Sequence, residues 1–368
     1  MRELVQPVYG GDMTIQEISV QRLMSQRLLQ PTLATPAEVV RWMGAVQAQD
    51  FLGSLWAIGC RMQDATEGVV EQAIAERTIL RTWPMRGTVH FVPAEDARWM
   101  LDLMTPRVIT RSQYYYRQAG LDDAVFARSR DLFIRALEGG KQLTRGKLYE
   151  LLEAEGIATV NSRGLFIIGN LSQTGLICFG ARQGKQPTFT LLDEWVPNMR
   201  TLTREEALAE IALRYFRSHG PATIHDFVWW TGLLMADARA GLDAVKSHFI
   251  GETIEGKTYW WAETMSSVPM SSPALHLLPA FDEYMVSYED RSASLDPQHE
   301  RLSVSANQLS SIIGIDGQVV GNWKRTIKKG AVMIETTLAR TLTPAESEQF
   351  ESAAQRYGEF LGLPVVIA

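Results

Sequence analysis

Two glutamines that flank a single alanine are the residues in this chain whose types and spacing first suggest chemistry. Gln47 and Gln49 lie in the segment Ala45–Phe51, which reads AVQAQDF and falls where a helix predicted over residues 36–46 should end. A glutamine side chain accepts a hydrogen bond from water through its oxygen and donates one through its nitrogen, but it is not a strong general base. The pair can therefore position a water molecule without deprotonating it. Taken alone, such a pair is more often a set of ordinary polar residues at a helix end.

Two further segments are dense in residues that can carry chemistry. Residues 81–90 read RTWPMRGTVH, and residues 278–291 read LPAFDEYMVSYEDR. The second segment contains the neighbouring acids Asp282 and Glu283, which have the appearance of a carboxylate pair for acid–base catalysis. The more common use of such a pair is structural, as helix caps and as partners of arginine side chains.

The elements that must position these residues repeat one order along the chain: helices, a helix–turn–helix and a two-stranded hairpin. This order is typical of a winged-helix domain. The predicted domains are residues 1–120, which contain the glutamine motif, residues 121–200 and residues 201–270. No clear repeat of individual residues accompanies the repeat of pattern.

Residues 271–368 have a different pattern. Asp316 and Gly317 suit a type I′ hairpin turn, and residues 344–361 have the apolar spacing of a closing amphipathic helix. This part is predicted to be a β-rich subdomain. The predicted fold class is therefore α+β and mainly helical, with three tandem winged-helix domains and a C-terminal β-rich subdomain.

Composition and missing motifs exclude several classes of protein. Two cysteines, Cys60 and Cys178, are too few for a disulfide framework or a four-ligand zinc site, so we expect each to be a buried apolar residue. No apolar run is long enough to span a membrane, and the first residues lack the order of a signal peptide, so we expect a cytoplasmic protein. Phosphate-loop, dinucleotide, nucleophile-elbow and zinc-protease motifs are missing, and the six histidines are scattered. We therefore expect no cofactor and no metal.

The charge balance bears on nucleic-acid binding. The chain has 36 Lys and Arg against 42 Asp and Glu, a net charge of −6, which argues against a uniformly basic molecule. A helix–turn–helix array without a cofactor motif nevertheless favours nucleic acid as the partner. An acidic net charge and a nucleic-acid partner are compatible if positive potential is confined to one concave face. Basic clusters occur over residues 107–117 and 141–147, and the best candidate to contact DNA follows the late hairpin: Lys324, Arg325, Lys328 and Lys329.

The glutamine motif, the 81–90 segment and the 278–291 segment, together with DGQVVGNW at residues 316–323, resemble the AlkZ/YcaQ-type bacterial DNA glycosylases in order and total length. The resemblance covers essentially the whole chain. The catalytic signature of that family is Gln, an aliphatic residue, then Gln or Asp, which implies that Gln47 and Gln49 are catalytic and that this chain belongs to the two-glutamine branch. We expect DNA contacts from the other candidate site residues: Arg86, Thr88, His90, Tyr288, Arg291, Lys324, Arg325, Lys328 and Lys329.

The resemblance implies a monofunctional DNA glycosylase that hydrolyses the N-glycosidic bond of cationic N7-alkylated purines. The two-glutamine branch includes enzymes that unhook interstrand crosslinks, so such crosslinks are a further expected substrate. A purine alkylated at N7 is already a good leaving group, and the transition state resembles an oxocarbenium ion. Such an enzyme must position water and stabilise positive charge. The expected partner is double-stranded DNA with alkylated purines, bound by a monomer that associates with the nucleoid.

Two other functions compete with this one. A non-catalytic winged-helix transcription regulator would bind undamaged operator DNA, although no ligand-sensing domain or dimerisation helix is recognisable. A catalytically silent damage-binding scaffold is the second.

Trp229 and Trp230 resemble a base-stacking platform, but their helical spacing beside Ile224 and Phe227 places at least one of them in the core.

Because positions i and i+2 do not share a helix face, Gln47 and Gln49 can reach one water only at a helix end or break.

Overall fold

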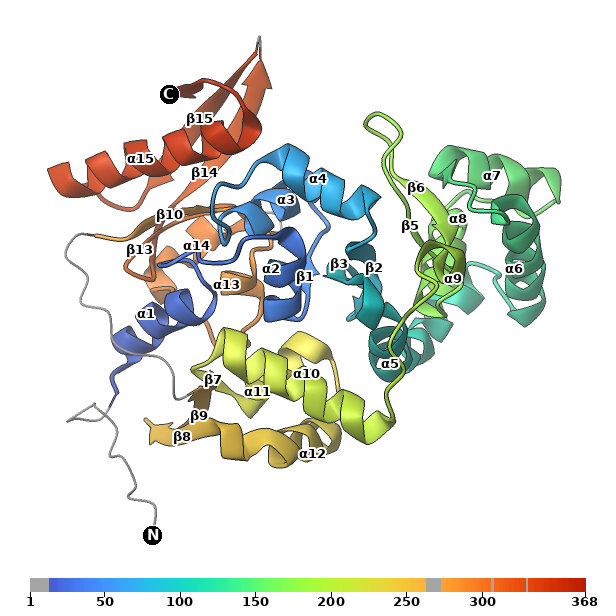
Figure 1. Cartoon of the computed structure of the whole chain (residues 1–368), viewed down its shortest axis with the longest axis horizontal. Coiled ribbons are helices and arrows are strands. Elements are labelled where there is room, and N and C mark those ends of the chain that lie inside the picture. Colours follow the sequence, from blue (N-terminus) through green and yellow to red (C-terminus); the bar gives the residue numbers. More distant parts are fainter. Residues whose placement is uncertain (1–12, 263–272, 306–307, 329) are drawn as a thin grey trace.

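The computed structural model describes residues 13–262, 273–305, 308–328 and 330–368. Within these ranges, helices pack around three separate three-stranded sheets, one five-stranded sheet and one two-stranded sheet. The predicted α+β class is confirmed. Figure 1 shows the first unit near the middle of the molecule, residues 121–200 at one end, the third unit below and the C-terminal part at the other end.

The first unit carries the glutamine motif on a very short strand. Its sheet has the order β1-β3-β2, so the strand formed before the helix–turn–helix pairs with the second strand of the hairpin. Its elements are α1 (Ile15–Ser25), α2 (Pro36–Met43), β1 (Val46–Gln47), α3 (Phe51–Gly59), α4 (Glu67–Ala75), β2 (Ile79–Met85) and β3 (Thr88–Pro93).

One boundary in this unit differs from the predicted one. The helix expected to reach residue 46 ends at Met43, because Gly44 adopts a φ of 78°, which takes the chain out of the helix. After the hairpin, α5 (Ala97–Gln118) continues past Pro106. Packing of α5 against α8 (Arg163–Gln173) and α10 (Arg204–His219) outweighs the helix-breaking preference of proline.

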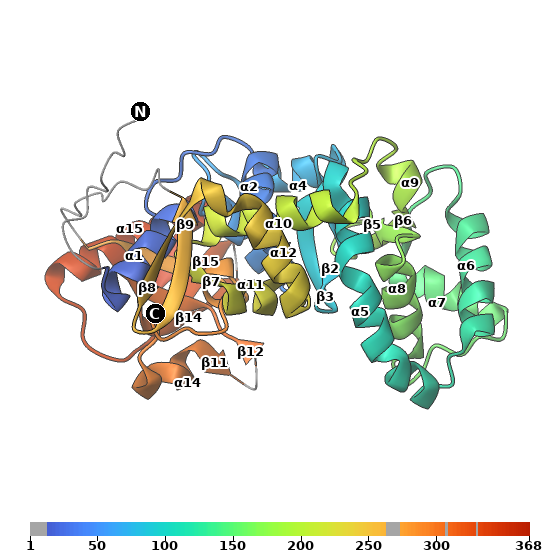
Figure 2. The ribbon, with the colours of Figure 1, turned by 90° about the horizontal axis from the view of Figure 1, so that it is seen from below.

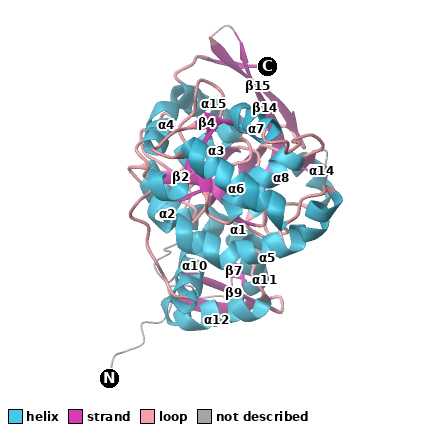
Figure 3. Cartoon of the chain, turned by 90° about the vertical axis from the view of Figure 1, so that its right-hand side faces the viewer, coloured by secondary structure: helices cyan, strands magenta, loops and turns pink. Residues whose placement is uncertain are grey.

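The second and third units have the same sheet order as the first, β4-β6-β5 and β7-β9-β8. Figure 3, seen from the side of the second unit, shows helices covering most of these short strands. The second unit consists of α6 (Asp123–Leu137), β4 (Leu143–Thr144), α7 (Arg145–Ala154), α8 (Arg163–Gln173), β5 (Ile177–Phe179), β6 (Thr188–Leu191) and α9 (Leu192–Trp195). The third consists of α10 (Arg204–His219), β7 (Ala222–Thr223), α11 (Ile224–Thr231), α12 (Met235–Val245), β8 (Phe249–Ile254) and β9 (Lys257–Ala262).

The C-terminal part is built on the five-stranded sheet, in the order β10-β13-β14-β15-β16. Its hairpin turn confirms the type I′ prediction, since Asp316 and Gly317 have φ angles of 50° and 82°. A Cβ on Gly317 would also lie 2.6 Å from the Ser19 hydroxyl, so the turn packs tightly on α1. The elements are β10 (Leu275–Leu278), α13 (Glu283–Val286), α14 (Glu300–Ser303), β11 (Val304–Ser305), β12 (Gln308–Leu309), β13 (Ile312–Ile315), β14 (Gln318–Lys328), β15 (Ala331–Leu338), α15 (Pro344–Leu361) and β16 (Val365–Ile367).

The C-terminal part and the first unit share one hydrophobic core. The indole of Trp56 on α3 packs against Tyr357 and Phe360 of α15, with ring centroids 5.1 Å apart in both pairs. Trp323 of β14 also packs against Tyr357, edge to face. Cys60 and Cys178 are buried free thiols, as predicted. This packing brings α13 and β14 against the end of the first unit that carries the glutamines.

Candidate active site

The two glutamines lie beyond the end of α2, where the chain is no longer helical. Gln47 is the last residue of β1 and pairs with His90 across the β1–β3 ladder, whereas Gln49 lies in the bend that follows the strand. The Gln47 Nε2 atom donates a hydrogen bond of 2.6 Å to Gln49 Oε1. Gln47 is 7% exposed, whereas Gln49 is at the surface. The pair therefore consists of two hydrogen-bonded carboxamides, of which that of Gln47 is buried and that of Gln49 is open to solvent.

Arg86, at the turn of the β2–β3 hairpin, orients the inner glutamine. Its Nη2 atom donates to Gln47 Oε1 at 2.9 Å and lies 3.4 Å from His90 Nε2. His90 Nδ1 lies 3.0 Å from the Thr88 carbonyl oxygen, which can only accept, so Nδ1 carries the proton and Nε2 accepts from Arg86. Burial, and then the Arg86 cation, lower the pKa of His90 to about 3. The imidazole is therefore neutral and serves as an acceptor that fixes the guanidinium.

Glu283, the first residue of α13, holds the backbone of the motif. Its Oε1 atom accepts a hydrogen bond of 2.6 Å from the backbone N–H of Gln47. Its Oε2 atom accepts one of 2.9 Å from Trp230 Nε1 and another from the Ser287 hydroxyl. The side chain is completely buried. Burial raises the pKa of a carboxylic acid, but His219, whose Nε2 lies 3.8 Å away, together with the Ser287 hydrogen bond, lowers the pKa of Glu283 to about 2. The carboxylate is therefore ionised and fully engaged.

Two more arginines contact the motif. Arg81 donates through Nε and Nη2 to the Ala48 carbonyl oxygen, at 3.1 and 2.7 Å. Arg325 of β14 places Nη2 3.2 and 3.1 Å from the two carboxylate oxygens of Asp50. Arg291 lies outside the motif and donates from Nε to the Met285 carbonyl oxygen at 2.7 Å. Cations from two separate parts of the chain thus contact the segment of Gln47 to Asp50.

The structure brings most of the predicted site residues together. Arg86, Thr88 and His90 surround Gln47, and Arg325 of the C-terminal part lies beside Asp50. The expected contact between His90 and DNA is wrong, because its side chain is completely buried and its two ring nitrogens are held by Arg86 and the Thr88 carbonyl oxygen. Lys324 and Lys328 are exposed on β14. Lys329 lies outside the described residues.

Tyr288 requires a correction. Its side chain is 1% exposed, its hydroxyl donates to the His219 carbonyl oxygen and accepts from Gln26, and the Arg22 guanidinium stacks on its ring. The expected contact between Tyr288 and DNA is therefore wrong. The ring and the hydroxyl group of Tyr288 are both engaged inside the protein, by Arg22, Gln26 and the His219 carbonyl oxygen.

The carboxylate pair has the structural role. Asp282 forms a two-point salt bridge with Arg61, at 2.9 and 2.8 Å, and accepts from the Tyr284 amide as the cap of α13. Both carboxylates are buried, which leaves neither free to exchange protons with a substrate. The role of Glu283 as anchor of Gln47 is the feature that the sequence did not reveal. Its signal was a pair of acids, Asp282 and Glu283, within an otherwise apolar run at residues 277–286.

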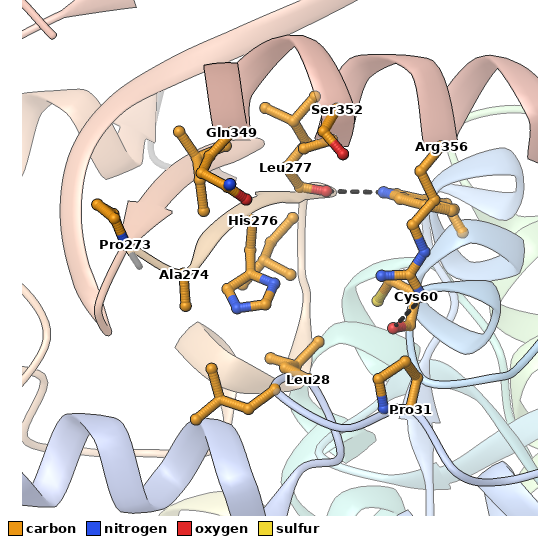
Figure 4. A pocket seen from close by; sticks show the side chains of 15 residues that line it. Leu28, Pro31, Cys60, Pro273, Ala274, His276, Leu277, Gln349, Ser352 and Arg356 are labelled. Carbon is orange, nitrogen blue, oxygen red and sulfur yellow. Dashed lines mark hydrogen bonds between the residues drawn. The ribbon is translucent and has the colours of Figure 1, made fainter. Parts of the chain in front are cut away.

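Other site types find little support in the described part of the chain. It contains no group of three His, Cys, Asp or Glu side chains suited to a metal ion, and no helix long and apolar enough to cross a membrane. A cavity of about 310 Å³ lies between β10, α15 and the connection from α1 to α2, with His276 and Arg356 in its wall (Figure 4). No predicted site residue lines it. The segment around Gln47 and Gln49 remains the candidate active site.

Comparison with known proteins identifies the family. Residues 40–360 match the family model described as DNA glycosylase AlkZ-like. The chain belongs to this family. It is 25% identical over 320 residues to the interstrand DNA cross-link repair glycosylase of Streptomyces sahachiroi, which covers 82% of this chain and 85% of that protein. The solved structure of Streptomyces sahachiroi DNA glycosylase AlkZ superposes with a TM-score of 0.80 at 22% identity, over 97% of this chain and all of that one.

Replacing Glu283 by alanine tests its anchoring role. The substitution leaves the backbone N–H of Gln47, the Trp230 indole and the Ser287 hydroxyl without their buried acceptor. Each unsatisfied buried donor lowers the free energy of unfolding by about 1–3 kcal/mol. We expect urea unfolding to show a loss on the order of 3 kcal/mol for Glu283→Ala and a smaller loss for Ser287→Ala. Equal stability of Glu283→Ala and the unchanged protein would contradict the anchoring role.

The acidity of Glu283 makes a separate prediction about pH. Its folded pKa of about 2 is below the ordinary 4.5, so its contribution to the free energy of unfolding is complete above about pH 4.5 and is lost as the pH falls toward 2. The stability of Glu283→Gln should fall less steeply over this window, because the amide does not titrate. Circular dichroism during acid titration measures the stability of both proteins. If stability falls equally steeply with pH in Glu283→Gln and in the unchanged protein, the low pKa of Glu283 is refuted.

Proposed function

We propose that this protein is a monofunctional DNA glycosylase that releases cationic N7-alkylated purines by attack of water on the anomeric carbon. The observation that carries this proposal is the hydrogen-bonded pair of Gln47 and Gln49, oriented by Arg86 and anchored through Glu283. Membership of the DNA glycosylase AlkZ-like family supports the reaction class. It does not favour a non-catalytic regulator.

The arrangement of polar groups supports a mechanism by positioning. The Gln47 oxygen accepts from Arg86 and keeps a second lone pair for a water molecule. The nearby carboxylates are not poised as bases, since Glu283 is buried and engaged and Asp50 is paired with Arg325. Without a strong base, such a site attacks only a glycosidic bond that is already weakened. A purine carrying positive charge at N7 fulfils that condition, whereas normal bases do not.

We extend the proposal to interstrand crosslinks. The relative from Streptomyces sahachiroi is named an interstrand DNA cross-link repair glycosylase, and the outer carboxamide, that of Gln49, is exposed rather than enclosed. An open site accommodates a base that remains attached to a second strand. Removal of that base would unhook the crosslink by the same hydrolysis.

We further propose that residues 1–120, 121–200 and 201–270 are winged-helix domains and residues 271–368 a separate subdomain. The identical order of strands in the three small sheets supports this division. Figure 2 shows the β2–β3 hairpin, α11 and α14 toward one side of the molecule, which we propose as the side that binds duplex DNA. Lys324 and Lys328 of β14 are exposed and are proposed to contact its phosphates. We expect a monomer on DNA, in the cytoplasm with the nucleoid.

Removing both carboxamides tests the proposed catalysis. We expect Gln47→Ala/Gln49→Ala to lose about 100-fold or more in the rate of abasic-site formation from a duplex with N7-methylguanine, since positioning of a reactant contributes at least that much. Gln355→Ala, an exposed glutamine on α15, is the matched control and should retain full activity. Base release by the double variant at the rate of the unchanged protein would refute the proposal. The same assay on a crosslinked duplex tests unhooking.

The exposed lysines of β14 give a prediction about DNA affinity. Lys324→Ala/Lys328→Ala should weaken duplex binding uniformly across sequences and reduce the slope of log K against log salt by about 2, because each phosphate contact contributes roughly 0.9. Lys246→Ala, which removes an exposed lysine from another surface, should leave the slope unchanged. Fluorescence anisotropy over a salt series measures both. A salt slope that is the same for all three proteins would place DNA elsewhere.

A further inference from the structure

Trp229 has an unusual environment for an indole. Its side chain is 45% exposed, although the next residue on α11, Trp230, is completely buried. The Trp229 Nε1 atom donates a hydrogen bond of 2.9 Å to the Val286 carbonyl oxygen at the end of α13. That bond fixes the orientation of the ring and satisfies its only polar atom. The ring is therefore held in one orientation with part of its apolar surface open to solvent.

Two separate connections fix Trp229 relative to the glutamines. The Arg86 guanidinium donates from Nη2 to Gln47 Oε1 at 2.9 Å and from Nη1 to the Trp229 carbonyl oxygen at 3.5 Å. Trp230, on the same helix, binds the carboxylate of Glu283 that also holds the Gln47 amide. One guanidinium and one carboxylate thus bridge α11 to β1. The exposed indole stands beside the candidate active site.

The charges around Trp229 suit an anionic polymer that carries flat rings. The Arg291 guanidinium carbon lies 5.7 Å from the centre of the Trp229 ring, and Arg86 contacts the carbonyl group of the same residue. Cations next to an aromatic ring allow phosphates to be neutralised while a base stacks on the ring. The π face of an indole also attracts a cation. A purine alkylated at N7 is both flat and cationic, so it stacks more favourably there than an uncharged base.

We propose that Trp229 is a specificity-determining residue, which stacks on the cationic ring of the alkylated purine and holds it beside Gln47 and Gln49. This inference rests on the proposed function. The aromatic ring that it receives could belong to the purine itself or to an aromatic adduct attached to it. A duplex with N7-methylguanine separates the two sources, because its adduct has no ring.

The test compares affinities for damaged and undamaged DNA. The probes are one duplex with a single 2′-fluoro-stabilised N7-methylguanine, whose glycosidic bond resists hydrolysis, and the same duplex with guanine. We expect Trp229→Ala to lose about tenfold to hundredfold in affinity for the methylated duplex and to bind the unmodified duplex as before. Trp229→Phe should recover part of the preference. Tyr115→Ala, which removes an aromatic side chain that is 59% exposed on α5, should leave the ratio of the two affinities unchanged.

The outcomes distinguish stacking from packing. Equal loss of affinity for both duplexes by Trp229→Ala, or no loss for either, would overturn the inference. A preference that depends on Trp229 only when the adduct carries an aromatic ring would also overturn it, because the purine would then not be the ring received. Binding to the inert duplex does not need base release. The inference therefore survives if the protein proves unable to release bases, and it fails separately if release proceeds with a preference that ignores Trp229.

Discussion

The hydrogen bonds of one buried carboxylate hold the candidate site together. Glu283 accepts from the backbone of Gln47, from the indole of Trp230 and from the hydroxyl of Ser287, and so joins the first unit, the third unit and the C-terminal part at one point. A buried anion is stable only when its oxygens are satisfied. Each of the three parts must therefore be in place for the others to pack. The position of Gln47 is a consequence of the whole fold rather than of the short strand that carries it.

The same constraint decides which chemistry the site can perform. His90 is neutral and accepts from Arg86, Glu283 is ionised and buried, and Asp50 faces Arg325. These groups fix the geometry of the two carboxamides, and none of them is poised to take a proton from water. A site of this kind achieves rate enhancement by orientation and electrostatics. The proposed mechanism depends on a leaving group that departs unaided, and such a mechanism would leave normal bases intact.

The sequence predicted local features well and long-range ones poorly. The turn at Asp316 and Gly317 and the hairpin around Arg86 follow from short-range backbone preferences, which are readable from adjacent residues. The link between Gln47 and Glu283 joins residues 236 positions apart, and no local pattern encodes it. Burial of Tyr288 has the same origin, since its partners come from α1, from the residue that caps it and from α10. The net charge of −6 was equally uninformative about DNA binding. The local charge around the glutamines depends on the arginines that contact residues 47–50, and not on the total charge of the chain.

The most direct test of this account is a crystal structure of the protein with a duplex that carries one hydrolysis-resistant N7-methylguanine nucleotide. The account predicts that the anomeric carbon of that nucleotide lies within one water molecule of the Gln47 and Gln49 carboxamides, and that the Glu283 carboxylate still binds the Gln47 amide. A complex in which the damaged nucleotide stays away from both glutamines, with the DNA bound across another face, would contradict it.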